Sequence, residues 1–125
     1  MTQASTIIFA DMVRALVKDG AAIIQELTPE QADMLHMGVG VSGEAGELLD
    51  AIKKHTIYGK ELDVKNVIEE LGDLEFYMEH LRQIVGITRQ QTIDANIAKL
   101  GKRYSSGTYS NDQAQTRADK VDETA

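Results

Sequence analysis

Residues 63–86 read DVKNVIEELGDLEFYMEHLRQIVG, and this stretch decides the fold class. Its large apolar side chains recur every three or four residues, which is the spacing of one face of an α-helix. Asp63 is a typical N-cap residue, and Gly86 suits the left-handed conformation in which many helices end. The pattern therefore predicts a helix over about residues 64–85 with an inward stripe of Val64, Val67, Ile68, Leu71, Leu74, Met78, Leu81 and Val85.

Helical patterns also lie on both sides of this stretch. Residues 28–31, Thr-Pro-Glu-Gln, combine an N-cap, a proline at the first helical position and a capping-box glutamine, and the pattern then continues to about residue 57. Residues 88–91, Thr-Arg-Gln-Gln, form a second capping box before a helix to about residue 103. Residues 6–27 have helical spacing that Gly20 interrupts, which predicts one long helix or two short ones. We therefore expect an all-α bundle of four to five helices.

Four glycines lie inside the helix predicted after residue 28. Gly38, Gly40, Gly43 and Gly46 are each about 1 kcal/mol less favourable than alanine in a helix interior. Either the helix bends near Gly38 and Gly40, or another part of the chain or a ligand comes very close. Close packing of a neighbouring helix is an equally simple explanation.

Composition limits the class of protein. The chain has 125 residues, 5% aromatic residues and one proline, which suits a single helical domain better than a β-sandwich. A net charge of −7 argues against a non-specific nucleic-acid binder and against a polybasic membrane-surface protein. The absence of cysteine excludes a disulfide framework and a thiolate zinc site. With no apolar run of membrane-spanning length and no basic leader, we expect a cytoplasmic protein.

The end of the chain differs from the rest. Beyond Tyr104 the sequence is polar, and residues 105–125 carry too few large apolar side chains to fold alone. We therefore predict an all-α domain over residues 1–104 and a C-terminal arm over residues 105–125 that is either docked or disordered.

Two short acidic spacings carry the functional signal. Glu44-x-x-Glu47 and Glu70-x-x-Asp73 each place two carboxylates on one face of a helix. With a stripe centred on Val41, Ala45, Leu48 and Ile52, antiparallel packing of the two helices puts both pairs on the same flank of the seam. The midpoint between the pairs falls in the loop near Tyr58, so the pairs also lie at the same height.

Four clustered carboxylates repel one another unless a cation compensates them. An all-oxygen, highly negative set of ligands favours Mg²⁺, or Mn²⁺, over zinc. A di-iron site would instead need Glu-x-x-His motifs, which His36, His55 and His80 do not complete. The spacing thus predicts a magnesium site.

Basic residues follow on the last predicted helix. Lys99 and Arg103 are four residues apart and share a face with Asn96. Cations at a helix C-terminus are favourable in any case. A metal-bound phosphate would also need cations opposite the metal, for which Lys53 and Lys54 are further candidates.

Together these motifs resemble the MazG-type, all-α nucleoside triphosphate pyrophosphohydrolase superfamily. The matching text is GEAGEL at 43–48, IEELGDLEFY at 68–77 and NIAKLGKRY at 96–104. These segments resemble the family's E-x-x-E, E-x-x-D and N-x-x-K-L-x-x-R-Y elements, in order, within about residues 30–118. Residues 103–109, RYSSGTY, depart from the family's usual Arg-Tyr-Pro.

The resemblance implies roles for particular residues. Glu44, Glu47, Glu70 and Asp73 match the catalytic carboxylates that bind the metal. The positions expected to meet substrate are Asn96, Lys99 and Arg103 at the triphosphate, Tyr77 and His36 at the nucleoside, with Lys54 and, from the arm, Arg117 as further candidates.

The resemblance also implies an activity and an assembly. The activity is Mg²⁺-dependent hydrolysis of a nucleoside triphosphate, a deoxynucleotide or a non-standard one, to the monophosphate and pyrophosphate. The assembly is a homodimer or a dimer of dimers, with no nucleic-acid or membrane partner. Two alternatives stay open: a phosphoribosyl-ATP pyrophosphohydrolase, and a non-catalytic helical dimer that binds nucleotides. No P-loop motif is present.

Overall fold

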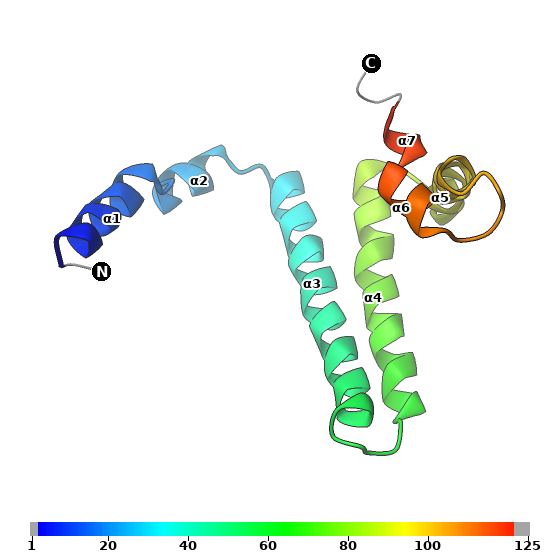
Figure 1. Cartoon of the computed structure of the whole chain (residues 1–125). Coiled ribbons are helices and arrows are strands. Elements are labelled where there is room, and N and C mark those ends of the chain that lie inside the picture. The colour runs from blue at the N-terminus through cyan, green and yellow to red at the C-terminus, as the bar shows by residue number, and fades with distance from the viewer. Residues whose placement is uncertain (1–2, 122–125) are drawn as a thin grey trace. The chain divides into compact units, whose positions relative to one another are not determined.

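The computed structural model describes residues 3–121, and every element in that range is a helix (Figure 1). The prediction of an all-α fold is confirmed. In chain order the helices are α1 (Gln3–Leu16), α2 (Gly20–Glu26), α3 (Pro29–Thr56), α4 (Val64–Val85), α5 (Arg89–Arg103), α6 (Asn111–Thr116) and α7 (Ala118–Val121).

The chain divides into two compact units, residues 1–35 and 36–125. The first unit contains α1, α2 and the first turns of α3. Asp19 is extended, with φ −67° and ψ 131°, and α2 begins at Gly20. The glycine therefore marks the start of a second short helix, so the two-helix form of the prediction holds.

Both predicted capping boxes are formed. The backbone N–H of Gln31 donates to Thr28 Oγ1 at 3.1 Å, while the N–H of Thr28 donates to Gln31 Oε1 at 3.0 Å. Thr88 and Gln91 make the same reciprocal pair at 3.1 and 2.8 Å. These bonds satisfy N–H groups that have no partner within a helix, so they set where α3 and α5 begin.

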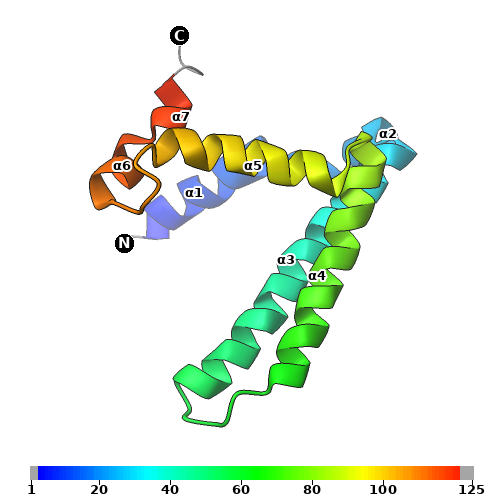
Figure 2. The same cartoon turned by 90° about the vertical axis from the view of Figure 1, so that its right-hand side faces the viewer.

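The part of α3 from His36 onward and α4 run side by side in opposite directions, forming a hairpin (Figures 1 and 2). Asp63 caps α4 by accepting a hydrogen bond from the N–H of Asn66 at 3.0 Å, and Gly86 ends the helix with φ 76°. At the end of α3, Nδ1 of His55 donates to the carbonyl of Lys60 in the connecting loop at 2.7 Å. The predicted ends of α4 are confirmed.

The seam of this hairpin differs from the predicted one. Ala45 and Ile52 of α3 are exposed, as are Val64, Ile68, Leu71 and Val85 of α4. From His36 onward, the buried or half-buried positions of α3 are Met37, Gly40, Val41, Glu44, Leu48 and Ala51. Those of α4 are Asn66, Val67, Glu70, Leu74, Tyr77, Met78, Leu81, Arg82 and Ile84. The apolar stripe on each helix is wider than the area that one neighbouring helix covers. The observed contact face is therefore rotated relative to the predicted one, and it includes Glu44 and Glu70.

One glycine of α3 has a clear steric reason. A Cβ atom at Gly40 would overlap the ring of Tyr77, whereas nothing lies near Gly38, Gly43 or Gly46. The helix continues without interruption from Pro29 to Thr56. The expected close approach therefore occurs at Gly40 only, and a side chain makes it.

Charged residues join the end of α4 to the start of α5. Arg82 is buried and contacts Glu79 at 2.8 Å and Glu75 at 3.9 Å, and Arg89 reaches Glu75 at 4.0 Å. From this junction α5 leaves the open end of the hairpin rather than running back along it (Figure 2).

The C-terminal arm is docked on α5 over its described part. Both α6 and α7 contact α5, and Arg103 binds Asp119 through two hydrogen bonds of 2.7 and 3.1 Å. Residues 122–125 of the predicted arm lie outside the described residues. Across residues 3–121, every helix is too short or too polar to cross a membrane.

Replacing Gly40 by alanine should lower the stability of the protein. The added methyl group forces the Tyr77 ring to move, which typically costs about 1–3 kcal/mol. Gly38→Ala is the matched control, because its methyl group meets open space and alanine is the better helix former by about 1 kcal/mol. Urea denaturation followed by circular dichroism measures both variants. Equal stability of the two would contradict the packing of Tyr77 on Gly40.

Candidate metal centre

Three carboxylates meet across the hairpin. Glu44 comes from α3, and Glu70 and Asp73 come from α4. One oxygen of each lies within 4.8 Å of the others. Glu44 and Glu70 are half-buried, while Asp73 is exposed, so the cluster opens to solvent on one side. The two helices thus supply a group of oxygen ligands to one point.

Glu70 is the most constrained of the three. Its Oε2 atom is buried and has no hydrogen-bond partner. A hydrogen bond with Glu44, burial, and the negative charges of Glu44, Asp73 and Glu47 raise the pKa of Glu70 to about 7. Near neutral pH, the site must therefore take up a proton or another cation to relieve the repulsion.

These residues fit a hard divalent cation. The three ligands are carboxylates, one oxygen of Glu70 lacks any other partner, and the open side leaves room for water or phosphate oxygens. Mg²⁺ and Mn²⁺ prefer such ligands. No histidine belongs to the cluster within the described range, which agrees with the case against a di-iron site.

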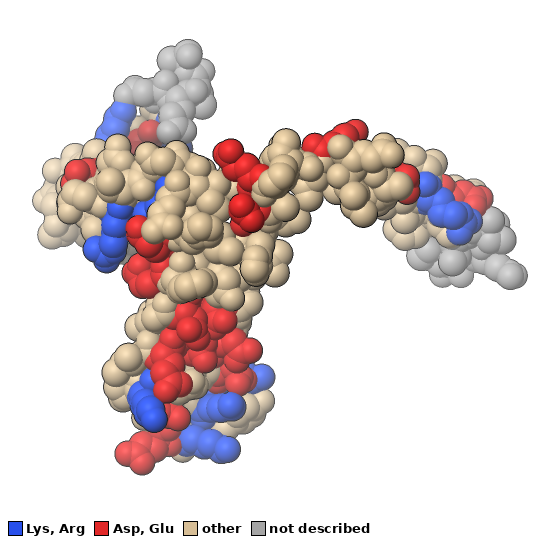
Figure 3. Space-filling view, turned by 180° about the vertical axis from the view of Figure 1, so that it is seen from behind, with Lys and Arg blue, Asp and Glu red and all other residues tan. Residues whose placement is uncertain are grey.

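Glu47, the fourth predicted carboxylate, lies outside this group. It is exposed, one turn along α3 from Glu44. Its charge still contributes to the raised pKa of Glu70, so it faces the same region. Acidic side chains gather over this hairpin in the space-filling view (Figure 3).

Two predicted nucleoside contacts lie on the same hairpin. The ring centroids of His36 and Tyr77 are 6.4 Å apart, and Phe76 meets Tyr77 edge-on at 5.2 Å. Tyr77 lies one turn beyond Asp73 on α4. An aromatic surface therefore adjoins the carboxylates.

The predicted phosphate contacts are not assembled with the carboxylates in one chain. Asn96 and Lys99 line a shallow pocket on α5 together with Thr92, Ile93 and Ala95. Asp73 and Val85 are 12 positions apart, which is already about 18 Å along the helix, and α5 then leads away from the hairpin (Figure 2). Helical spacing predicted that Glu44, Glu70 and Asp73 come together, but it did not predict the direction that α5 takes.

Two further basic candidates, Arg103 and Lys54, have acidic partners. Arg103 was expected to be open to phosphate, yet its side chain is 18% exposed and Asp119 holds it in a bidentate ion pair. This pairing raises the pKa of Arg103 and lowers that of Asp119. Lys54 binds Asp50 at 3.0 Å, and its pKa is raised by that hydrogen bond and charge.

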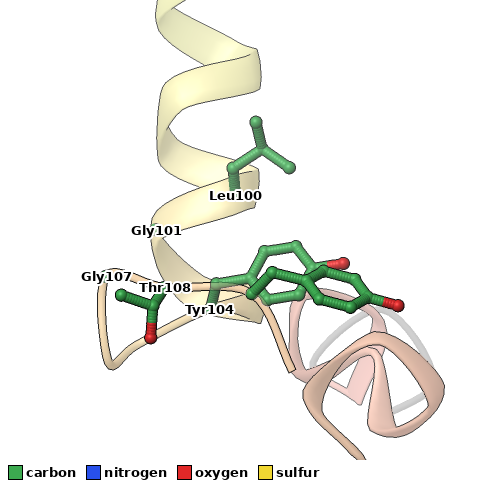
Figure 4. Close-up of a pocket in the computed structure, with 6 residues that line it drawn as sticks. Leu100, Gly101, Tyr104, Gly107 and Thr108 are labelled. Atoms are coloured by element: carbon green, nitrogen blue, oxygen red, sulfur yellow. The ribbon is translucent and has the colours of Figure 1, made fainter. Parts of the chain in front are cut away.

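Sequence reasoning missed Asp119, the partner of Arg103. The two residues are 16 positions apart, and no periodicity links them. It also missed a pocket of about 320 Å³ where the end of α5 meets the following loop, lined by Leu100, Gly101, Tyr104, Gly107, Thr108 and Tyr109 (Figure 4). The positive φ of Gly107, 80°, turns the chain there, and the rings of Tyr104 and Tyr109 lie 5.7 Å apart.

The comparison with protein families agrees with this arrangement. Residues 33–107 match the model of the MazG nucleotide pyrophosphohydrolase domain. The chain belongs to this family. The matched MazG domain includes α4, α5 and the whole carboxylate cluster, whereas α6 and α7 lie beyond it. Neither the curated proteins nor the solved structures contain a match.

The raised pKa of Glu70 predicts how stability depends on pH. A carboxyl group whose pKa is higher in the folded protein stabilises it fully below the unfolded value of 4.5, and this contribution disappears as the pH rises through about 7. The melting temperature of the metal-free protein should therefore fall over that range. Saturating Mg²⁺ should prevent the fall, because it binds only the folded cluster.

Differential scanning calorimetry in chelator and in Mg²⁺ measures this dependence. Glu70→Gln should flatten the pH profile in chelator, while Glu69→Gln, which changes the exposed neighbour, should leave it as in the unchanged protein. A melting temperature that changes with neither pH nor Mg²⁺ would contradict the proposed interaction of these carboxylates with each other and with a metal.

Proposed function

We propose that this MazG domain hydrolyses a nucleoside triphosphate, a deoxynucleotide or a non-standard one, to the monophosphate and pyrophosphate in a Mg²⁺-dependent reaction. The observation that carries the proposal is the meeting of Glu44, Glu70 and Asp73 around the unpartnered Glu70 Oε2. Family membership supports nucleotide pyrophosphohydrolase chemistry in general.

The carboxylates would bind the metal, and the metal would carry the phosphates. Glu44, Glu70 and Asp73 are the proposed ligands. When bound, Mg²⁺ neutralises phosphate charge and lowers the pKa of the attacking water. Because both helices are rigid and capped, the three ligands are held in place before substrate arrives.

In the proposed reaction, the water oxygen forms a bond to the α-phosphorus. The bond from that phosphorus to the oxygen bridging the α- and β-phosphates breaks, and pyrophosphate leaves with the bridging oxygen and its electron pair. One proton of the water passes to a carboxylate. We assign this role to Glu47, because it lies beside the cluster without belonging to the group of three.

The nucleoside would lie against Tyr77 and His36. Their rings stand beside each other on the hairpin, one turn from Asp73, and an aromatic face is a suitable surface for a base. Lys99, Asn96 and Arg103 would stabilise charge on the phosphates. Since α5 leads away from its own hairpin, these groups would reach the substrate from a second copy of the chain.

A second copy would also cover apolar surface that one chain leaves exposed. Of the apolar side chains described, Met37 and Ala51 are buried, while Ile68 is 64% and Leu71 48% exposed on α4. A lone helical hairpin buries too little to be stable by itself, and two hairpins that pack together form a four-helix bundle. We therefore propose a homodimer, or a dimer of dimers, with α4 at an interface.

Loss of a ligand should abolish turnover. Glu70→Gln and Asp73→Asn each remove a charged oxygen from the cluster, so we expect pyrophosphate release to fall by at least about a hundredfold while the helical circular dichroism persists. Glu69→Gln is the matched control, since Glu69 lies outside the cluster on the same helix, and it should keep near-normal turnover.

The assay should cover normal and modified triphosphates and phosphoribosyl-ATP. Turnover of phosphoribosyl-ATP alone would favour the biosynthetic alternative. Equal, negligible turnover by the unchanged protein and Glu70→Gln on every substrate would favour a nucleotide-binding protein without catalysis.

A charge on the exposed face of α4 should break the assembly. Ile68→Asp costs little in a monomer, where the side chain faces water, but would bury an unpaired carboxylate in the proposed interface. Light scattering should then give a mass near that of one chain, against at least twice that mass for the unchanged protein. Lys60→Asp, which changes an exposed side chain in the loop between α3 and α4 instead of the exposed face of α4, controls for added charge. A monomeric unchanged protein would contradict the proposal.

A further inference from the structure

We propose that the C-terminal arm is an autoinhibitory strap, in which Asp119 occupies the guanidinium of Arg103 until a phosphate group displaces it. This inference rests on the proposed function, because it takes Arg103 to be a phosphate ligand. It goes beyond that function because it assigns a role to residues 108–121, which lie beyond the part of the chain that matches the family.

The first observation is the geometry of the pair. Nε and Nη2 of Arg103 donate to the two carboxylate oxygens of Asp119 at 2.7 and 3.1 Å. Guanidinium binds phosphate oxygens through the same two-point contact. Asp119 therefore occupies a guanidinium edge that a phosphate group would also use, and the two anions exclude each other there.

The second observation is how the arm is held. Within residues 105–121 the large apolar side chains of Tyr109 and Val121 are 71% and 60% exposed, and the half-buried apolar side chains are Ala114 and Ala118. The side chain of Asp119 is only 3% exposed. The arm is therefore anchored on α5 by its buried ion pair more than by hydrophobic contact.

The rings of Tyr104 and Tyr109, 5.7 Å apart, add a contact between the end of α5 and the arm, and polar bonds hold the arm together internally. Gln113 bonds Ser105 and Ser106 at 3.3 and 3.1 Å, and all three residues belong to the arm itself. Helices as short as α6 and α7 are not stable by themselves. Loss of the buried Arg103–Asp119 pair should therefore favour release of α7 from α5.

Exchange of anions makes the release feasible. Removing Asp119 without replacement would leave a nearly buried guanidinium unpaired, which is strongly unfavourable. An incoming triphosphate supplies several phosphate oxygens to the same donors, so Arg103 stays paired, while Asp119 regains water as α7 leaves. The apparent association constant for triphosphate is therefore the intrinsic constant multiplied by the fraction of molecules in which the arm is open.

The test measures binding of inorganic tripolyphosphate in Mg²⁺ by calorimetry. Asp119→Asn keeps the shape of the side chain but removes the charge that competes for Arg103. If the arm is open in one in ten molecules of the unchanged protein, the Asp119→Asn variant should bind tripolyphosphate about tenfold more tightly. Asp112→Asn, which removes a charge from an exposed position in the same arm, should bind as the unchanged protein does.

The effect must pass through Arg103. Arg103→Gln should weaken binding, and adding Asp119→Asn to it should give no gain, because there is no guanidinium left to release. Unchanged binding in Arg103→Gln would refute the assignment of Arg103 to phosphate within the proposed function. Weaker binding in Arg103→Gln without tighter binding in Asp119→Asn would refute the strap alone.

Hydrogen exchange on the unchanged protein tests the same movement without a mutation. Tripolyphosphate should reduce the protection of backbone amides in 118–121, since α7 leaves as Asp119 is displaced. Protection that stays equal or rises would overturn the proposal, even if Asp119→Asn failed to fold. Faster turnover in Asp119→Asn would extend the result from binding to catalysis, because damage to the structure slows an enzyme rather than accelerating it.

Discussion

The repulsion between Glu44 and Glu70 across one helical seam is the constraint on which the rest of the molecule depends. Both side chains occupy positions where apolar residues would pack more favourably, and one oxygen of Glu70 is left without a partner. Such an arrangement persists only if the surrounding structure holds it. Here the capping bonds at Thr28 and Asp63 and the left-handed turn at Gly86 set the ends of the two helices, and the Tyr77 ring packs on Gly40 across the seam one turn from the cluster.

The same constraint explains why a small hairpin can serve as a ligand-binding element. A cation at the cluster would turn the repulsion into attraction and so favour the folded hairpin. Because the ligands lie on regular helices, their spacing follows from the backbone and needs no loop to adjust. Tyr77 also helps to hold the two helices together. Its ring fits against α3 only because position 40 lacks a side chain, and this contact lies just beyond the acidic cluster.

Local signals in the sequence predicted the helices well, because caps and periodicity act over a few residues. The capping boxes at Thr28 and Thr88 and the ends of α4 are where the side chains placed them. The meeting of Glu44 with Glu70 and Asp73 also followed from spacing, although the seam is rotated and leaves Glu47 outside the group. What could not be predicted was non-local: the direction that α5 takes from the end of α4, and the pairing of Arg103 with Asp119.

The separation of acidic and basic groups has a physical consequence for a triphosphate. Within one chain, the hairpin attracts cations and repels phosphate, while the basic residues of α5 lie away from it or, as with Arg103, are neutralised by the arm. A phosphate chain can therefore bind the carboxylates only with a metal between them, and it reaches the guanidinium only by replacing a carboxylate that already satisfies it. If the proposed contacts hold, both conditions would make the unliganded protein a poor phosphate binder. In the proposed assembly, binding would depend on the metal, the arm and a second copy together, so that neither the metal nor the nucleotide alone would complete the site.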